Sequence, residues 1–124
     1  MKKVTFDPNG SSLKVDFQFK GFIVASYTYT LWEADSNHRI VREKGNNQNP
    51  QDDSYELPVP LSSNKNRLIQ LRTEFVAQDP DNIKEYSILA EVYQGDQLIG
   101  SAEDQGANTG SSQDSLLFIM LTTS

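Results

Sequence analysis

Oxygen-bearing side chains that could hold a metal ion are concentrated in three stretches predicted to be loops, 44–54, 78–85 and 104–114. The candidate ligands are Asp52, Asp53, Asp79, Asp81, Asn82, Asp104 and Asp114. If each connection from Arg39 onward reverses the chain, successive loops alternate between the two ends of the fold, so these three share one end. Calcium takes about six to eight oxygen ligands from flexible loops. The pattern therefore predicts a calcium site there, the alternative being that Asp and Asn are abundant because they form turns.

The single tryptophan, Trp32, is the second candidate for a binding role. It shares the alternation phase of Thr28 and Thr30, so if the other phase forms the core, the indole points outward. An exposed indole can stack on a sugar ring or anchor a protein partner. Its predicted neighbours in the binding site are Asn37, Asn64 and Asn66, whose amides suit carbohydrate hydroxyls. The alternatives are that Trp32 folds over the rim of the core and that these asparagines are ordinary turn residues.

Catalytic constellations are sparse. His38, the only histidine, lies in a predicted turn and is expected to be solvated. Glu33 lies directly beside Trp32, and a carboxylate-based hydrolase around Trp32 is our third hypothesis. No serine has the strand-turn-helix setting of a nucleophile, and there is no glycine-rich phosphate loop. We therefore expect no catalytic activity.

Composition limits the classes of partner. The chain has 124 residues, no cysteine, 11 Lys and Arg, and 17 Asp and Glu, for a net charge of −6. Nucleic-acid binding needs a basic face, which the composition does not predict. The longest apolar run, Leu116–Leu121, is too short to cross a bilayer as a helix, so we expect no membrane insertion. The sequence as written shows no signal peptide, which favours the cytoplasm and leaves open export without a signal.

The elements that position these residues are β-strands, because apolar residues alternate with polar ones. Leu13, Val15, Phe17 and Phe19 define the clearest half-buried strand. The same odd phase continues beyond Gly21 as far as residue 31, whereas a tight hairpin at 20–21 would switch it to even positions. The continuity predicts a strand that is kinked or bulged at Gly21 and passes from one sheet to the other.

Further strands are predicted over 39–43, 55–59, 67–78, 86–94, 97–103 and 115–123, with a two-residue turn at Gly95-Asp96. Seven to nine short strands predict an all-β fold, an antiparallel two-sheet β-sandwich, with immunoglobulin-like, C2-like and jelly-roll strand orders left open. Residues 1–124 form one domain in this interpretation. Residues 1–11 are either a loosely held N-terminal strand or an arm.

The final strand, with Leu116–Leu121, is apolar on both faces, so it is either central or the contact surface of a homo-oligomer. Our first hypothesis is a non-catalytic module that acts through its surface, binding a protein or carbohydrate partner or assembling with itself. The alternative is a calcium-dependent module that binds a carbohydrate or a lipid headgroup through its acidic loops.

Overall fold

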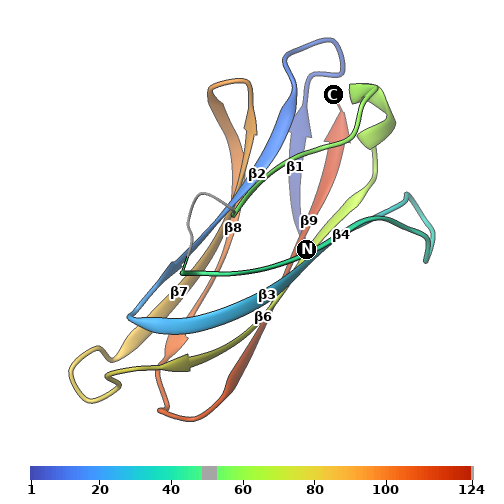
Figure 1. The fold of residues 1–124 in the computed structure, drawn as a ribbon. Coiled ribbons are helices and arrows are strands. Elements are labelled where there is room, and N and C mark those ends of the chain that lie inside the picture. Colours follow the sequence, from blue (N-terminus) through green and yellow to red (C-terminus); the bar gives the residue numbers. More distant parts are fainter. Residues whose placement is uncertain (49–52, 124) are drawn as a thin grey trace.

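The structure, a computed structural model that describes residues 1–48 and 53–123, consists of two β-sheets that pack face to face (Figure 1). Strands make up 64% of it and helix 3%, which confirms the predicted two-sheet β-sandwich. The five-stranded sheet has the order β1 (Lys2–Phe6), β9 (Gln113–Thr123), β6 (Leu68–Ala77), β3 (Ile23–Trp32) and β4 (Arg39–Asn46). The four-stranded sheet has the order β5 (Ser54–Glu56), β2 (Leu13–Lys20), β7 (Glu85–Gln94) and β8 (Gln97–Ala107). One 3-10 turn, η2 (Leu61–Asn64), precedes β6.

The sandwich departs from the predicted antiparallel pattern at the N-terminal strand. β1 pairs with β9 in parallel, with Lys2 opposite Ile119 and Phe6 opposite Thr123. Its two inward side chains, Val4 and Phe6, are each 2% exposed and belong to the core. A parallel pair is possible here because almost the whole chain separates the two strands, which leaves ample length for the crossover that parallel strands require.

The chain passes from one sheet to the other at Gly21, as the alternation predicted. β2 belongs to the four-stranded sheet and β3, which follows it directly, to the five-stranded sheet. Gly21 has φ +106°, and a Cβ there would lie 2.5 Å from the carbonyl oxygen of Glu85. Glycine is therefore required at the crossing, both for its backbone angle and for this close approach.

The crossing keeps the odd residues of β2 and β3 in one core. Phe17 packs edge-on against Tyr27 and Tyr29, with ring centroids 5.5 and 5.6 Å apart. Because side chains alternate along a strand, Thr28 and Trp32 are directed to the outer face of the five-stranded sheet. This outer face carries the candidate site.

The last strand, β9, is interior, since β1 and β6 pair with its two edges. Leu117, Ile119 and Leu121 are buried, whereas Leu116 on the outer face is 52% exposed. Homo-oligomerisation through this strand stays a prediction, and it requires the outer face, because both edges are already paired. No helix among residues 1–48 and 53–123 is long and apolar enough to span a membrane.

Candidate functional site

Trp32 lies at the end of β3, with its side chain on the outer face of the five-stranded sheet. The neighbouring strand β6 places Leu68 opposite it and Gln70 two residues further along. The indole nitrogen Nε1 donates a hydrogen bond of 2.8 Å to Oε1 of Gln70. This bond fixes the orientation of the ring, and the side chain remains partly exposed.

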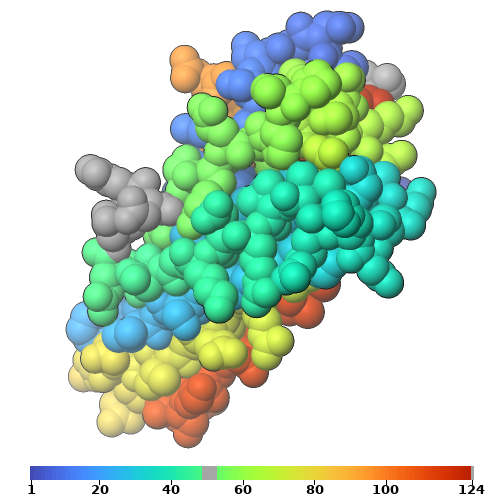
Figure 2. Space-filling view, turned by 45° about the vertical axis from the view of Figure 1, so that its right-hand side comes forward, coloured from blue at the N-terminus to red at the C-terminus, as the bar shows by residue number. Residues whose placement is uncertain are grey.

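A hollow of about 340 Å³ beside the indole brings together three of the four predicted binding residues, Trp32, Asn37 and Asn66. We call it the Trp32 hollow; its other lining residues are Glu33, Asp35, Ser36, Leu68, Gln70 and Met120. Apart from Trp32 at the end of β3, the residues that line the hollow come from the β3–β4 loop, from the segment between η2 and β6, and from β6 and β9. The β3–β4 loop and the segment around η2 lie side by side (Figure 2).

Both of these segments have fixed backbones where they border the hollow. The β3–β4 loop is closed by a hydrogen bond from the Glu33 N–H to the His38 carbonyl oxygen, at 2.9 Å. Asn66 has φ +64°, which asparagine tolerates better than most residues, and its N–H donates to the Leu121 carbonyl oxygen at 2.7 Å. Asn37 and Asn66 therefore project exposed amides from ordered turns.

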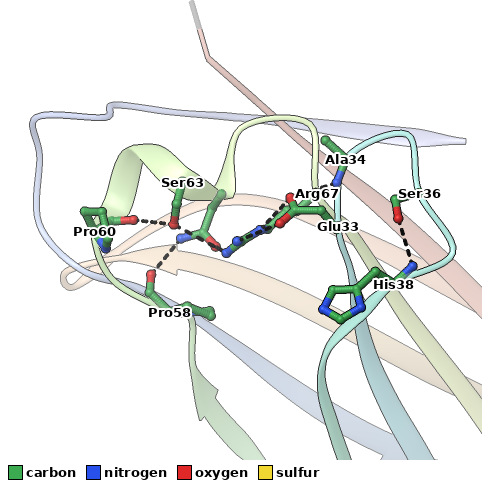
Figure 3. Close-up of polar contacts among 9 residues, drawn as sticks. Glu33, Ala34, Ser36, His38, Pro58, Pro60, Ser63 and Arg67 are labelled. Atoms are coloured by element: carbon green, nitrogen blue, oxygen red, sulfur yellow. Dashed lines mark hydrogen bonds and ion pairs between the residues drawn. The ribbon is translucent and has the colours of Figure 1, made fainter.

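An ion pair between Glu33 and Arg67 joins the two segments (Figure 3). The guanidinium donates through Nε to Oε1 of Glu33 at 3.2 Å and through Nη2 to Oε2 at 3.1 Å, a two-pronged contact. This arginine is itself buried, with 8% exposure. Hydrogen bonds from Arg67 and from the Ala34 N–H hold the pKa of Glu33 below its ordinary value. Glu33 is thus a carboxylate, fixed in place.

Asn64, the fourth predicted binding residue, lies outside the hollow. It is 0% exposed, and its amide is used internally. Nδ2 donates to the Pro58 carbonyl oxygen at 2.9 Å, and Oδ1 accepts from Nη1 of Arg67 at 3.1 Å. Sequence reasoning could not separate this asparagine from its neighbour Asn66, because the difference is one of burial. Asn64 supports Arg67 and makes no part of the hollow's surface.

Sequence reasoning missed a second hollow that also borders the indole. It measures about 440 Å³ and is lined by Thr28, Thr30, Trp32, Arg39, Arg42, Gln70, Arg72 and Glu74. We call it the arginine hollow. The alternation of β3 already indicated that Thr28 and Thr30 are on the outer face. Without the β3–β4 register, however, the sequence could not show which cations of β4 lie beside them.

The candidate calcium ligands within residues 1–48 and 53–123 are dispersed, although two of the predicted loops do meet. Asn108 donates its backbone N–H to the Lys84 carbonyl oxygen at 2.8 Å, which joins the segment 78–84 to the segment 108–112. The ligands in the first segment are Asp79, Asp81 and Asn82, and Nδ2 of Asn82 bonds both Asp79 carboxylate oxygens at 3.2 Å.

The remaining candidate ligands that the structure describes lie in strands or in the core. Asp104 is in β8 and accepts a hydrogen bond from the Tyr86 hydroxyl, and Asp114 is in β9 opposite Glu74. Asp53 is 4% exposed and accepts from the Tyr27 hydroxyl at 2.6 Å. Asp52 falls outside the described residues. Across the part of the chain that the structure describes, no three His, Cys, Asp or Glu side chains are grouped to hold a metal ion.

No family model matches the chain, and comparisons with curated proteins and with solved structures gave no match.

Proposed function

We propose that this protein is a non-catalytic binding module and that the Trp32 hollow is its ligand site. The observation that carries the proposal is the convergence of Trp32, Asn37 and Asn66, from separate segments, on one hollow. Ligand sites typically combine an apolar or aromatic surface with a few fixed polar groups. The Trp32 hollow has this composition.

A sugar ring is the ligand class that best suits these groups. An indole presents a broad apolar surface, and amides offer both donors and acceptors for hydroxyl groups. Asn37 and Asn66 supply the amides, and the Gln70 bond holds the indole in one orientation before a ligand arrives. Pre-organisation of this kind lowers the entropic cost of binding.

The state of Glu33 supports a binding function over hydrolysis. A glycosidase needs a carboxylic acid with a raised pKa, opposite a second carboxylate. The pKa of Glu33 is instead lowered by its hydrogen bonds from Arg67 and Ala34, so this group is a poor proton donor near neutral pH. Both of its oxygens are also occupied by the guanidinium.

The test uses the fact that Trp32 is the only tryptophan in the chain. Its fluorescence reports on the surroundings of this one side chain, so we expect a saturable change when soluble polysaccharides or their oligosaccharides are added. Retardation in native gels that contain the same polysaccharide measures the affinity. We expect Trp32→Ala to lower this affinity about tenfold, equivalent to about 1.4 kcal/mol. The matched control is Phe22→Ala, which removes an aromatic side chain that is 61% exposed and lies at the sheet crossing.

Two results would contradict the proposal: no fluorescence change with any polysaccharide of a broad panel, or equal retardation of Trp32→Ala and the unmodified protein. Running the gels in calcium and in chelator tests the calcium-dependent alternative. We expect equal mobility in both, because no metal-holding group lies among the described residues around the hollow.

A further inference from the structure

Cationic side chains gather on the outer face of the five-stranded sheet, in a protein whose net charge is −6. Arg42 lies opposite Thr30 and Lys44 opposite Thr28 in the β3–β4 register. Arg72, on the other side of β3, also lies opposite Thr28. Residues directly opposite each other on paired strands point to the same side of a sheet. Together with Arg39, which lines the arginine hollow, these residues form what we call the basic face: Arg39, Arg42, Lys44 and Arg72.

The charge of the basic face is largely uncompensated. Within residues 1–48 and 53–123, no ion pair forms to Arg39, Arg42 or Lys44. Arg72 approaches Glu74 at 3.8 Å, but the two side chains are 59% and 63% exposed, so water screens the pair. Arg67 differs from these residues, because its guanidinium forms an ion pair with Glu33 at 3.1 Å. The basic face therefore presents charge to solvent.

The basic face is continuous with the Trp32 hollow, because Trp32 and Gln70 line both hollows. Thr28 and Thr30 line the arginine hollow together with the indole and the arginines. A ligand that stacks on the indole and extends along β3 would thus pass from a neutral and acidic surface to a basic one.

We propose that the ligand is an acidic polysaccharide, with a sugar ring at Trp32 and the carboxylates of neighbouring sugars on Arg39 and Arg42. This inference rests on the proposed function and adds the charge class of the ligand. A guanidinium binds a carboxylate through two parallel hydrogen bonds, so arginine suits this group better than lysine.

Charge density favours an acidic polysaccharide over a nucleic acid. Duplex DNA carries about one charge per 1.7 Å of its axis, and proteins that bind single strands stack several bases on successive aromatic rings. The basic face offers four cations and one indole, and the protein's net charge repels a dense polyanion. A polymer of uronic acids carries one carboxylate on each sugar, alternating with apolar ring faces and hydroxyls.

The experiment compares two forms of one polymer: polygalacturonate and the same backbone with its carboxylates methyl-esterified. Affinity is measured by native gels and by Trp32 fluorescence. We expect the unmodified protein to bind the de-esterified form about tenfold more tightly, with the preference falling as salt is raised from about 0.05 to 0.5 M.

The variant Arg39→Gln/Arg42→Gln should lose this preference and keep any binding to the esterified form. The matched control, Lys20→Gln/Lys84→Gln, removes the same net charge from exposed side chains that do not line either hollow and should retain the preference. Thermal melts of both variants verify that they are folded.

The outcomes separate the two proposals. Equal binding to both polymers, or a preference unchanged in Arg39→Gln/Arg42→Gln, overturns the inference and leaves the proposed function standing. If acidic polymer binds through the arginines but Trp32→Ala binds equally well, the proposed function fails together with the sugar contact at Trp32, and only the carboxylate contacts of Arg39 and Arg42 are upheld. Tighter binding of single-stranded DNA than of polygalacturonate would assign the basic face to nucleic acid and overturn the inference. A molecular mass in solution that rises with protein concentration, and is lower in Arg39→Gln/Arg42→Gln, would assign it to self-association and also overturn the inference.

Discussion

Replacing Arg67 by methionine tests whether the ion pair beneath the Trp32 hollow stabilises the fold. Methionine fills much of the same volume but has no donor and no charge. The substitution removes four hydrogen bonds that the guanidinium makes, to both carboxylate oxygens of Glu33, to the hydroxyl of Ser63 and to Oδ1 of Asn64.

The size of the effect follows from which acceptors water can reach. Glu33 is 36% exposed in its side chain, so water replaces the lost bonds there and the cost is small. Asn64 is 0% exposed, and its Oδ1 is left unsatisfied, which costs about 1–3 kcal/mol. We therefore expect the free energy of unfolding to fall by about 2 kcal/mol. At about 2.1 cal/mol/K of unfolding entropy per residue, this lowers the Tm by about 8 °C.

Urea unfolding followed by circular dichroism, with a thermal melt beside it, measures this loss. The control is Arg72→Met, the same substitution at an exposed arginine on the adjoining strand β6, which should change the unfolding free energy by less than about 0.5 kcal/mol. If the two variants lose equal stability, the buried hydrogen bonds of Arg67 contribute no more to the free energy of unfolding than an exposed arginine does. A similar loss in Arg67→Lys would show that the guanidinium's geometry, rather than its charge, is required.

Two further predictions concern titration and the core. The folded-state pKa of Glu33 lies below its unfolded value of 4.5 because of the hydrogen bonds from Arg67 and Ala34, so the pair's stabilisation is present above about pH 5 and is lost as the pH falls through the folded-state pKa. The difference in unfolding free energy between the unmodified protein and Glu33→Gln should accordingly shrink on acidification, and a pH-independent difference would refute this. The Thr73 hydroxyl is fully buried and has no hydrogen-bond partner among the described residues, so Thr73→Val should leave stability unchanged or raise it by about 1 kcal/mol. A loss above about 1 kcal/mol in chemical denaturation would contradict that expectation.

Local alternation made the strands and their faces predictable. The odd phase that runs through Phe17, past Gly21 and on to Leu31 identified both the sheet crossing and the core side of two strands. The same phase directed Trp32 to the outer face. These features depend only on the period of two along an extended chain, which any single strand displays in its own sequence.

Features that depend on pairing between distant segments were not predictable. The parallel pairing of β1 with β9 has no local signature, since neither strand encodes the direction of its neighbour. The predicted bounds of the loop 104–114 were wrong: β8 extends to Ala107 and β9 begins at Gln113, so Asp104 and Asp114 lie in strands and the connecting segment is 108–112. The contact between Glu33 and Arg67 joins residues 34 positions apart and is equally invisible to periodicity.

The cations of β4 have a structural explanation that must be weighed against a binding role. β4 is an edge strand, and charged side chains on an edge discourage pairing with another chain. This explains Arg42 and Lys44, but it does not explain Arg72, which lies on β6 in the interior of the sheet and lines the same hollow as Arg42. Edge protection also does not require the cations to adjoin the one tryptophan. Edge protection alone therefore does not account for cations on both sides of β3. Their placement favours a role in binding a ligand that lies across this face of the sheet.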